Sequence, residues 1–201
     1  VKRTPLADYA NIRSNGLRAV NINDDDDLLT VILTSGEDHI FMGTRRGMAI
    51  RFPETDVRSM GRLAAVVRGI MLRGDDTVKE VAAFAADEQA DILVVTDQGY
   101  GKRTPVSEFR IQGRGGLGIT LVKLTDRNGE VAAIRFVEPS DQIMAMTERG
   151  IVIRTGVEEI RQAGRATQGV RVIRVEEGDR VVTVAKVEER DEDDDAEVTE
   201  E

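Results

Sequence analysis

The clearest pattern in the chain begins at residue 91, ends at residue 109 and reads DILVVTDQGYGKRTPVSEF. An apolar, β-branched run is followed by a turn that contains glycine and then by a second short run that carries basic residues. Two such runs around a glycine turn are typical of a β-hairpin. The same order recurs at residues 40–51 and 143–154, so the chain repeats with a period of about 51 residues. The turn glycines of the three copies are Gly47, Gly99 and Gly150.

Two further sequence features, which we call anchors, recur with the same spacing as these glycines. An acidic residue followed by a large apolar or aromatic residue forms the pairs Asp8-Tyr9, Asp56-Val57, Glu108-Phe109 and Glu159-Ile160. Apolar runs are centred on Val31, Val81, Val131 and Val181. The anchors divide the body of the chain into one partial and three complete units, at about 1–39, 40–90, 91–141 and 142–187. Because the chain starts within a unit and without Met, we expect it to be the C-terminal part of a longer protein.

One complete unit predicts four short strands that form a single antiparallel sheet. After the first hairpin of residues 91–105 come a Gly-rich loop, a strand over residues 119–124, an Asn128-Gly129 hairpin turn and a strand over residues 131–137. Residues 78–86 are rich in Ala, yet they occupy the slot of residues 131–137, so we expect a strand there too. Four-stranded units repeated at this length predict an all-β fold of propeller type, with blades in a radial or spiral array.

Composition excludes several classes of function. The chain has 201 residues, 40% of them hydrophobic, and no cysteine, which excludes disulfides and thiolate metal sites. Its apolar runs, such as residues 63–67, are far shorter than the roughly 20 residues of a membrane helix, so we expect no membrane partner. The net charge of −9 resides in residues 188–201, an acidic tail that we expect to be disordered. Residues 1–187 hold 27 basic and 27 acidic side chains.

Residues 113–118 formally contain the motif GxGxxG, for which three interpretations are open. A dinucleotide site requires a helix after the glycines, whereas residues 119–122 read as a strand. The segment is otherwise either a plain connecting loop or an anion-binding loop, in which glycines let the backbone approach a phosphate and Arg114 binds it. The repeat context favours the anion-binding loop.

The chain carries no pattern that predicts catalysis. His39 is the single histidine, follows Asp38 at a turn and has no cysteine or second histidine as a partner, so we expect it at the surface. The P-loop motif is absent from the sequence, and we expect no cofactor in this segment. Aromatic residues make up only 3% of the chain, which argues against single-strand binding by base stacking.

Several features together resemble a known family: the period of about 51 residues, Gly101–Thr104, the turn at Thr34–Asp38, the stretch Gly164–Gly169 and the acidic tail. They resemble the C-terminal domain of the DNA gyrase A protein. The resemblance implies a six-bladed β-pinwheel whose basic outer rim binds and wraps duplex DNA, and this chain would hold blades three to six. It also implies a box in the first blade, reading Gln-Arg-Arg-Gly-Gly-Lys-Gly, that wrapping requires.

Residues 112–118 match this box in part, and we interpret them as a degenerate second box, with the main box before Val1. The matching residues are Gln112, Arg114, Gly115, Gly116 and Gly118. Other basic residues recur after the turns and around the box loop, which predicts a phosphate-binding stripe. These further candidate DNA contacts are Lys2, Arg3, Arg13, Arg51, Arg68, Lys102, Arg103, Arg154 and Arg165.

For the whole protein the resemblance implies DNA gyrase, an ATP-dependent type II topoisomerase that introduces negative supercoils. ATP, Mg²⁺ and the gyrase B protein would be bound by regions outside this segment, in an A2B2 holoenzyme in the bacterial cytoplasm at the nucleoid. Two alternatives remain, the corresponding domain of topoisomerase IV and a non-catalytic protein-interaction propeller of the kelch type. The kelch type would show paired glycines and aromatics in every unit, yet this chain has no Trp and one Gly-Gly pair.

Overall fold

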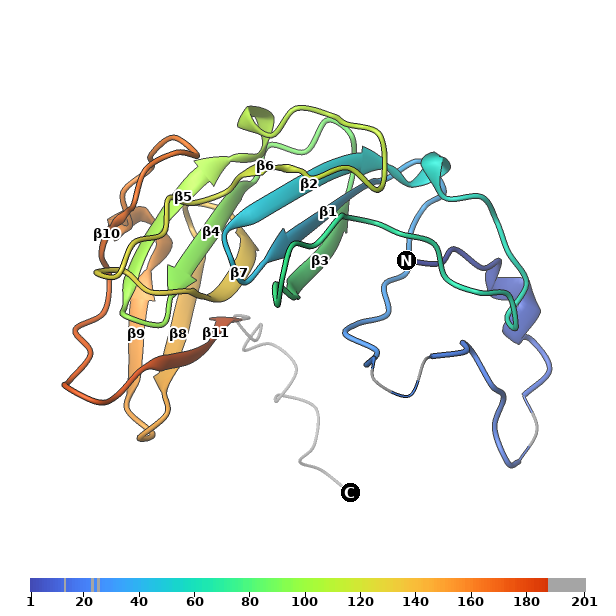
Figure 1. The fold of residues 1–201 in the computed structure, drawn as a ribbon, viewed down its shortest axis with the longest axis horizontal. Coiled ribbons are helices and arrows are strands. Elements are labelled where there is room, and N and C mark those ends of the chain that lie inside the picture. Colours follow the sequence, from blue (N-terminus) through green and yellow to red (C-terminus); the bar gives the residue numbers. More distant parts are fainter. Residues whose placement is uncertain (13, 23, 25, 188–201) are drawn as a thin grey trace, which may run out of the picture.

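The computed structural model describes residues 1–187 apart from residues 13, 23 and 25, and this part of the chain forms three antiparallel sheets that stand side by side in an arc (Figure 1). The arrangement confirms the predicted all-β class of the β-pinwheel type. The acidic tail, for which the sequence predicts disorder, lies outside the described residues. None of the described helices has the length and apolar character that crossing a membrane requires.

All three sheets follow one strand order. The first sheet has the order β3-β1-β2-β6, with β1 His39–Thr44, β2 Met48–Pro53, β3 Val78–Phe84 and β6 Ile119–Thr120. The second sheet has the same order, β7-β4-β5-β10, with β4 Asp91–Thr96, β5 Tyr100–Pro105, β7 Val131–Val137 and β10 Val170–Arg171. The third sheet, as far as the structure describes it, has the order β11-β8-β9, with β8 Gln142–Thr147, β9 Val152–Gly156 and β11 Val181–Val187.

Each sheet is built on a hairpin with a glycine turn, as the repeat predicts. Gly47, Gly99 and Gly150 have φ values of +77°, +77° and +85°, which only glycine adopts at low cost. A one-turn 3-10 helix follows the second strand of each hairpin, and another lies near the start of the chain. These helices are η1 Leu6–Tyr9, η2 Glu54–Asp56, η3 Val106–Glu108 and η4 Val157–Glu159.

The fourth strand of a sheet comes from the next unit, so the prediction that one unit forms one complete sheet is wrong. β6 belongs to the third unit but pairs with β2 of the second unit, and β10 likewise pairs with β5. The Asn128-Gly129 hairpin is also wrong, because β6 and β7 lie in different sheets. The pairing is physically favourable, since the borrowed strand covers backbone groups that the outer edge of the preceding sheet would otherwise expose.

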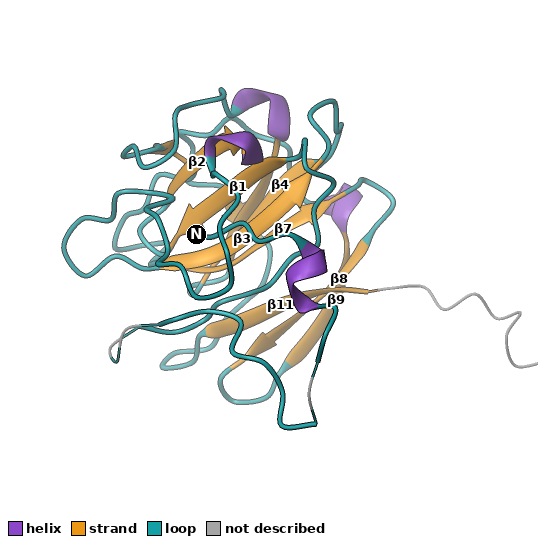
Figure 2. Cartoon of the chain, turned by 90° about the vertical axis from the view of Figure 1, so that its right-hand side faces the viewer, coloured by secondary structure: helices purple, strands orange, loops and turns teal. Residues whose placement is uncertain are grey.

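The core lies between the sheets, and the middle sheet is buried on both faces. Ile92 and Val94 of β4 pack into a cluster with Phe41 of the first sheet, and Leu93 and Val95 pack into a cluster with the third sheet. This explains why β4 reads as an unbroken apolar run without polar alternation. β7 contacts both β3 and β11, and Figure 2 shows the third sheet beside it at an angle to the first.

The partial first unit has no strand among its described residues before His39. Its apolar run around Val31 is equivalent to β3, β7 and β11, yet Val31 is 82% exposed. A strand at that position would pair with the first strand of its own unit, and residues 1–38 contain no counterpart of that strand. The first three residues nevertheless occupy the slot of β2, because Arg3 forms a parallel bridge with Ser59.

Candidate nucleic-acid interface

After each one-turn helix of a complete unit, the chain crosses to the outer strand of the preceding unit and follows its edge. Gln112 donates its backbone N–H to the carbonyl of Arg51 at 2.8 Å, and Ala163 donates in the same way to Arg103 at 2.9 Å. A third such bond, 2.9 Å long, ends on the carbonyl of Arg3. We call the crossing segments clasps, and they comprise residues 58–73, 110–123 and 161–174.

Neighbouring clasps lie against one another. Gly115 donates its N–H to the carbonyl of Gly69 at 2.7 Å, which joins the clasps of the second and third units. Lys123 donates to the carbonyl of Thr167 at 3.1 Å, which joins the clasps of the third and fourth units. The three clasps therefore form one continuous band along the outer edges of the sheets.

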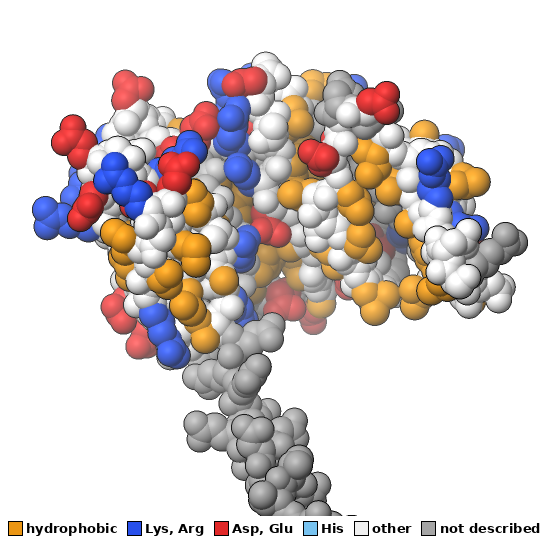
Figure 3. All heavy atoms as spheres, turned by 90° about the horizontal axis from the view of Figure 1, so that it is seen from below, with side chains coloured by type: hydrophobic (Ala, Val, Ile, Leu, Met, Phe, Trp, Pro, Cys, Tyr) orange, Lys and Arg blue, Asp and Glu red, His pale blue; other side chains and the backbone are white. Residues whose placement is uncertain are grey.

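This band carries strongly one-sided charge. The clasps contain eleven Lys and Arg residues and no Asp or Glu, although residues 1–187 as a whole are neutral. Elsewhere the charges are mixed: on the face in Figure 3, blue basic and red acidic side chains lie among exposed hydrophobic ones. We call the three clasps together the basic band. Its charged residues are Arg58, Arg62, Arg68, Arg73, Arg110, Arg114, Lys123, Arg161, Arg165, Arg171 and Arg174.

Arg51, a predicted DNA contact, is instead buried and joins neighbouring units through hydrogen bonds; we call such a contact a joint. It is only 7% exposed, and its Nε and Nη2 lie 3.0 and 2.7 Å from Nδ1 of His39. Nη1 donates to the carbonyl of Val106 at 3.2 Å, and Nη2 to that of Ala86 at 3.1 Å. His39 is buried too, so its predicted place at the surface is wrong. Burial beside the Arg51 guanidinium lowers the pKa of His39, which keeps Nδ1 unprotonated as an acceptor.

Lys102 is likewise withdrawn from solvent, which corrects its predicted role. Its side chain is fully buried, and Nζ donates to the carbonyls of Gly164 and Arg165 at 2.6 Å each. Burial lowers the pKa of Lys102 to about 8. Lys2 occupies the same slot in the first unit and donates to the carbonyl of Arg62. Lysine in this slot therefore fastens the next clasp, and for Lys102 contact with DNA is excluded.

Arg103 and Arg3 are also tied into joints between units. Arg103 is largely buried in an ion pair with Asp91, 2.8 Å long, and is therefore a poor DNA contact. Arg3 is half-buried and lies 3.8 Å from the carboxylate of Glu54. Among the other predicted contacts, Arg68 is exposed within the basic band, and Arg13 lies outside the described residues.

Arg114 and Arg165 occupy equivalent, half-buried positions in the third-unit and fourth-unit clasps. Arg114 donates from Nη1 to the carbonyl of Arg68 at 2.6 Å and from Nε to that of Asp56 at 3.2 Å. Arg165 donates from Nη1 to the carbonyl of Thr120 at 3.1 Å. The fork of each guanidinium keeps further N–H donors. Both residues thus join neighbouring clasps and still place positive charge in the band.

Close backbone packing requires the last glycine of the box-like segment. Gly118 has φ +73°, and a Cβ there would lie 2.4 Å from the carbonyl oxygen of Ala49. Gly169 repeats this at φ +79°. The N–H of Gly115 and the carbonyl of Gly116 both bond to the second-unit clasp. Clasp packing therefore explains Gly118 without a phosphate, and a phosphate contact at these glycines stays a prediction.

Gln112, which also belongs to the box-like segment, is half-buried, and its Nε2 has no hydrogen-bond partner among the described residues. The equivalent amide, Nε2 of Gln162, donates to Asp91 at 3.1 Å. His39 stands where Asp91 would be, and its Nδ1 already accepts from Arg51. Replacement of the carboxylate by an imidazole accounts for the unpaired amide.

Sequence reasoning missed Arg58, Arg110 and Arg161, which directly follow the buried apolar anchor of each complete unit. All three are exposed, and none makes a side-chain hydrogen bond or ion pair within the described part of the chain. Their backbones are fixed beside the joints at Arg3, Arg51 and Arg103. The absence of acidic residues from the surrounding segments was the available sequence signal.

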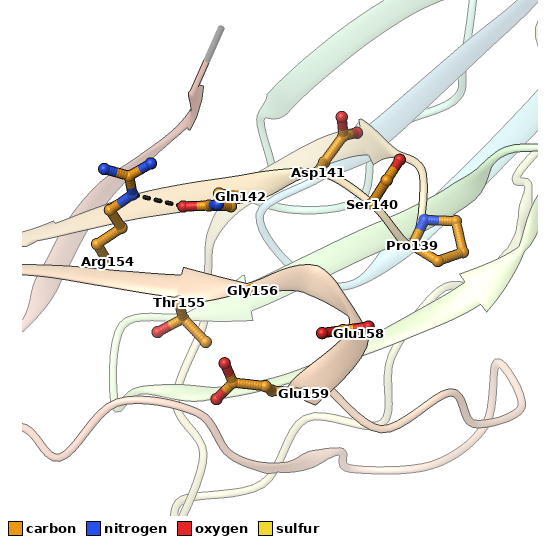
Figure 4. A pocket seen from close by; sticks show the side chains of 9 residues that line it. All are labelled: Pro139, Ser140, Asp141, Gln142, Arg154, Thr155, Gly156, Glu158 and Glu159. Atoms are coloured by element: carbon orange, nitrogen blue, oxygen red, sulfur yellow. Dashed lines mark hydrogen bonds between the residues drawn. The ribbon is translucent and has the colours of Figure 1, made fainter. Parts of the chain in front are cut away.

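A hollow in the fourth unit, shown in Figure 4, does not fit a phosphate. Asp141, Glu158 and Glu159 are among the residues that line it, and their carboxylates repel an anion. Arg154, a predicted DNA contact, also lines the hollow and donates from Nε to Oε1 of Gln142 at 2.5 Å. Arg154 is exposed, so its contact with DNA stays a prediction.

Comparison with known proteins assigns the family. The model of the "DNA gyrase C-terminal domain, beta-propeller" matches residues 1–35, 38–84, 90–138 and 141–188. The DNA gyrase A protein of Staphylococcus epidermidis is 45% identical over 191 residues, which are 95% of this chain and 21% of that protein. The Staphylococcus aureus protein is 45% identical over 193 residues, 96% of this chain and 22% of that protein. The chain thus spans about a fifth of the length of these relatives.

Two solved structures resemble most of the chain. The C-terminal domain of DNA topoisomerase IV aligns with a TM-score of 0.86 at 30% identity, covering 93% of this chain and 58% of that one. The DNA gyrase A C-terminal domain aligns with a TM-score of 0.76 at 26% identity, covering 86% of this chain and 58% of that one. The family model matches every unit in turn, and the chain therefore belongs to the DNA gyrase C-terminal domain family.

Proposed function

We propose that this chain binds duplex DNA along the basic band and bends it around the outer edges of the sheets. The observation that carries the proposal is the band itself, in which eleven basic and no acidic residues lie on three adjoining clasps. Contacts between basic side chains and phosphates supply most of the affinity of proteins that bind DNA without sequence preference. Arg58, Arg110 and Arg161 are among the band's available contacts, because they are exposed and unpaired within the described part of the chain.

Bending requires many such contacts. Smooth bending of a site of 20–30 base pairs by 40–90° costs roughly 1–6 kcal/mol, which several phosphate contacts must offset. The sheets stand in an arc, so a band along their outer edges presents charge on a curved path (Figure 1). Because the contacts are to phosphates, we expect little sequence preference.

The wider role proposed for this chain is that of the DNA-wrapping part of the DNA gyrase A protein, within a type II topoisomerase that introduces negative supercoils. The curated DNA gyrase A relatives, 45% identical to this chain, support this role. Binding of ATP and Mg²⁺, and assembly with the gyrase B protein as A2B2 in the bacterial cytoplasm at the nucleoid, belong to this proposal through regions outside the chain.

The second candidate is the corresponding domain of topoisomerase IV, whose solved structure has the TM-score of 0.86. The gyrase relatives favour the first candidate. An activity assay on a holoenzyme that carries this domain distinguishes the two candidates. The gyrase proposal expects ATP-dependent negative supercoiling of a relaxed plasmid, whereas relaxation alone would support topoisomerase IV. The kelch-type alternative receives no support from the family match.

Titration of the 201-residue chain with duplex DNA at a series of salt concentrations tests DNA binding directly. We expect log K to fall with log salt by about 0.9 for each phosphate contact, with similar values for unrelated duplex sequences. An affinity that does not depend on salt, or a strong preference for one sequence, would contradict the proposal.

A further inference from the structure

Tyr100, the first residue of β5, holds two arginines from separate segments. Nε of Arg127 donates to its hydroxyl at 2.9 Å, and Nη2 of Arg171 donates to the same oxygen at 3.1 Å. The two guanidinium carbons lie 5.1 and 5.5 Å from the centre of the tyrosine ring, which is cation–π distance. Tyr100 is buried, whereas both arginines are exposed.

The two positive charges have no carboxylate between them. Neither Arg127 nor Arg171 takes part in an ion pair in the described part of the chain. The charges that act on Tyr100 are those of the two arginines, whose hydrogen bonds lower the pKa of its hydroxyl. Two guanidinium groups held on one neutral oxygen repel each other, and an anion between them would relieve that repulsion.

Both arginines are positioned by rigid backbone. Arg171 lies on β10 directly opposite Tyr100 in the strand register. Arg127 lies in a loop that Asn128 fastens, because the buried Asn128 amide donates to the carbonyls of Lys123 at 2.9 Å and Gln168 at 3.3 Å. The loop is thus bound to two clasps. The loss of backbone conformational entropy when a ligand binds is therefore small.

We propose that Tyr100, Arg127 and Arg171 form a clamp for one phosphate group. The hydroxyl of Tyr100 accepts a bond from each arginine and keeps its own hydrogen to donate, while each guanidinium keeps further donors on its fork. For its ligand, a backbone phosphate of duplex DNA, the clamp rests on the proposed function. It adds to that function a fixed anchor at the junction of the third and fourth units.

The preceding junction lacks the clamp. There Met48 stands opposite Thr120 in the position where Tyr100 stands opposite Arg171. Neither a methionine nor a threonine can bind a phosphate through a charged fork. Of the two junctions built by β6 and β10, the second is therefore the one that holds the duplex through the clamp, and the exposed arginines of the other clasps contact it more loosely.

The salt dependence of DNA binding tests the clamp in the 201-residue chain. Because both clamp arginines hold one phosphate, the pair Arg127→Gln and Arg171→Gln reduces the slope of log K against log salt by about 0.9. The control pair Arg110→Gln and Arg161→Gln lies in separate clasps and reduces it by about 1.8. A slope for the clamp pair equal to that of the parent, or reduced as much as by the control pair, would overturn the clamp.

A second measurement separates failure of the clamp from failure of DNA binding. The chain has two tyrosines and no tryptophan, so in the Tyr9→Phe variant the absorbance of Tyr100 alone reports its ionisation. Inorganic phosphate, added against chloride at constant ionic strength, raises the pKa of Tyr100, and Arg127→Gln with Arg171→Gln abolishes the rise. A rise without any DNA binding would overturn DNA as the ligand. Normal DNA binding without a rise would overturn the clamp alone.

Discussion

Arg103 donates from Nη1 to Oδ2 of Asp91 at 2.8 Å, and this pair ties the end of β5 to the start of β4. The same guanidinium donates from Nε to the carbonyl of Ile160 at 2.8 Å in the next unit. A basic residue on the second strand of a hairpin therefore holds two units together. Arg58, Arg110 and Arg161, which lie on the clasps, face solvent instead.

Replacement of Arg103 by alanine lowers the free energy of unfolding by about 3 kcal/mol, because it leaves the buried carboxylate of Asp91 without its charged partner. Urea denaturation measures the change. The exposed Arg110→Ala serves as the control and changes stability by less than about 0.5 kcal/mol. An Arg103→Ala variant as stable as the parent would show that the joint does not hold the units.

The buried amine of Lys102 predicts a pH dependence of stability. Its pKa falls from 10.5 to about 8 on folding, so between these values the unfolded chain binds more protons than the folded one. Stability of the parent therefore rises with pH across this window relative to Lys102→Ile, by at most about 3 kcal/mol. Isoleucine is the natural residue in this slot at Ile50 and Ile153. Parallel stability curves for parent and variant between pH 8 and 10.5 would contradict the account.

His39→Asp copies the carboxylate that Asp91 supplies in the next unit and stabilises the fold. The new carboxylate accepts from Arg51 and also pairs the unsatisfied amide of Gln112, which together contribute about 1–2 kcal/mol. Denaturation at pH 7 measures the gain. His39→Asn, which is neutral, is the control and gains less. A less stable His39→Asp variant would refute the equivalence of the two positions.

Gly118→Ala costs at least about 2 kcal/mol of stability, because alanine resists a positive φ and its Cβ meets the carbonyl oxygen of Ala49. Gly116→Ala is the matched control: its φ is not positive, and the nearest atom would lie 3.6 Å away. We expect less than about 1 kcal/mol of change there. Thermal denaturation compares the two. Equal losses would indicate that close approach of the clasp does not determine the glycine.

The repeat, the strand class and the hairpins around Gly47, Gly99 and Gly150 could be predicted from the sequence, because β-branched apolar runs and turn glycines act locally. The partner of β6 could not. Its two residues, Ile119 and Thr120, have the same propensity whichever sheet they join, and their pairing with Met48 and Ala49 depends on a clasp that reaches back about 70 residues.

Which basic residues join units and which face solvent likewise depends on contacts between distant parts of the chain. Arg103 follows Lys102 and Arg161 follows Ile160, and nothing in these immediate neighbours distinguishes an arginine that connects two units from an exposed one. Arg103 meets Asp91 and Ile160 only after two units pack, and Arg161 is left on the outer side of that contact. The absence of acidic residues from whole segments predicts the positive surface better, because it does not depend on the direction in which each side chain points.

The salt dependence of duplex binding by a triple variant, Arg58→Ala with Arg110→Ala and Arg161→Ala, tests most directly whether the basic band carries the DNA. If each residue neutralises one phosphate, the slope of log K against log salt falls by about 2.7 while stability stays near that of the parent. The control removes the same charge from exposed residues outside the clasps, with Arg46→Ala, Lys79→Ala and Arg149→Ala, and we expect it to keep the parental slope. A triple variant of the band that keeps the parental slope and affinity, or a control that loses as much, would contradict the account.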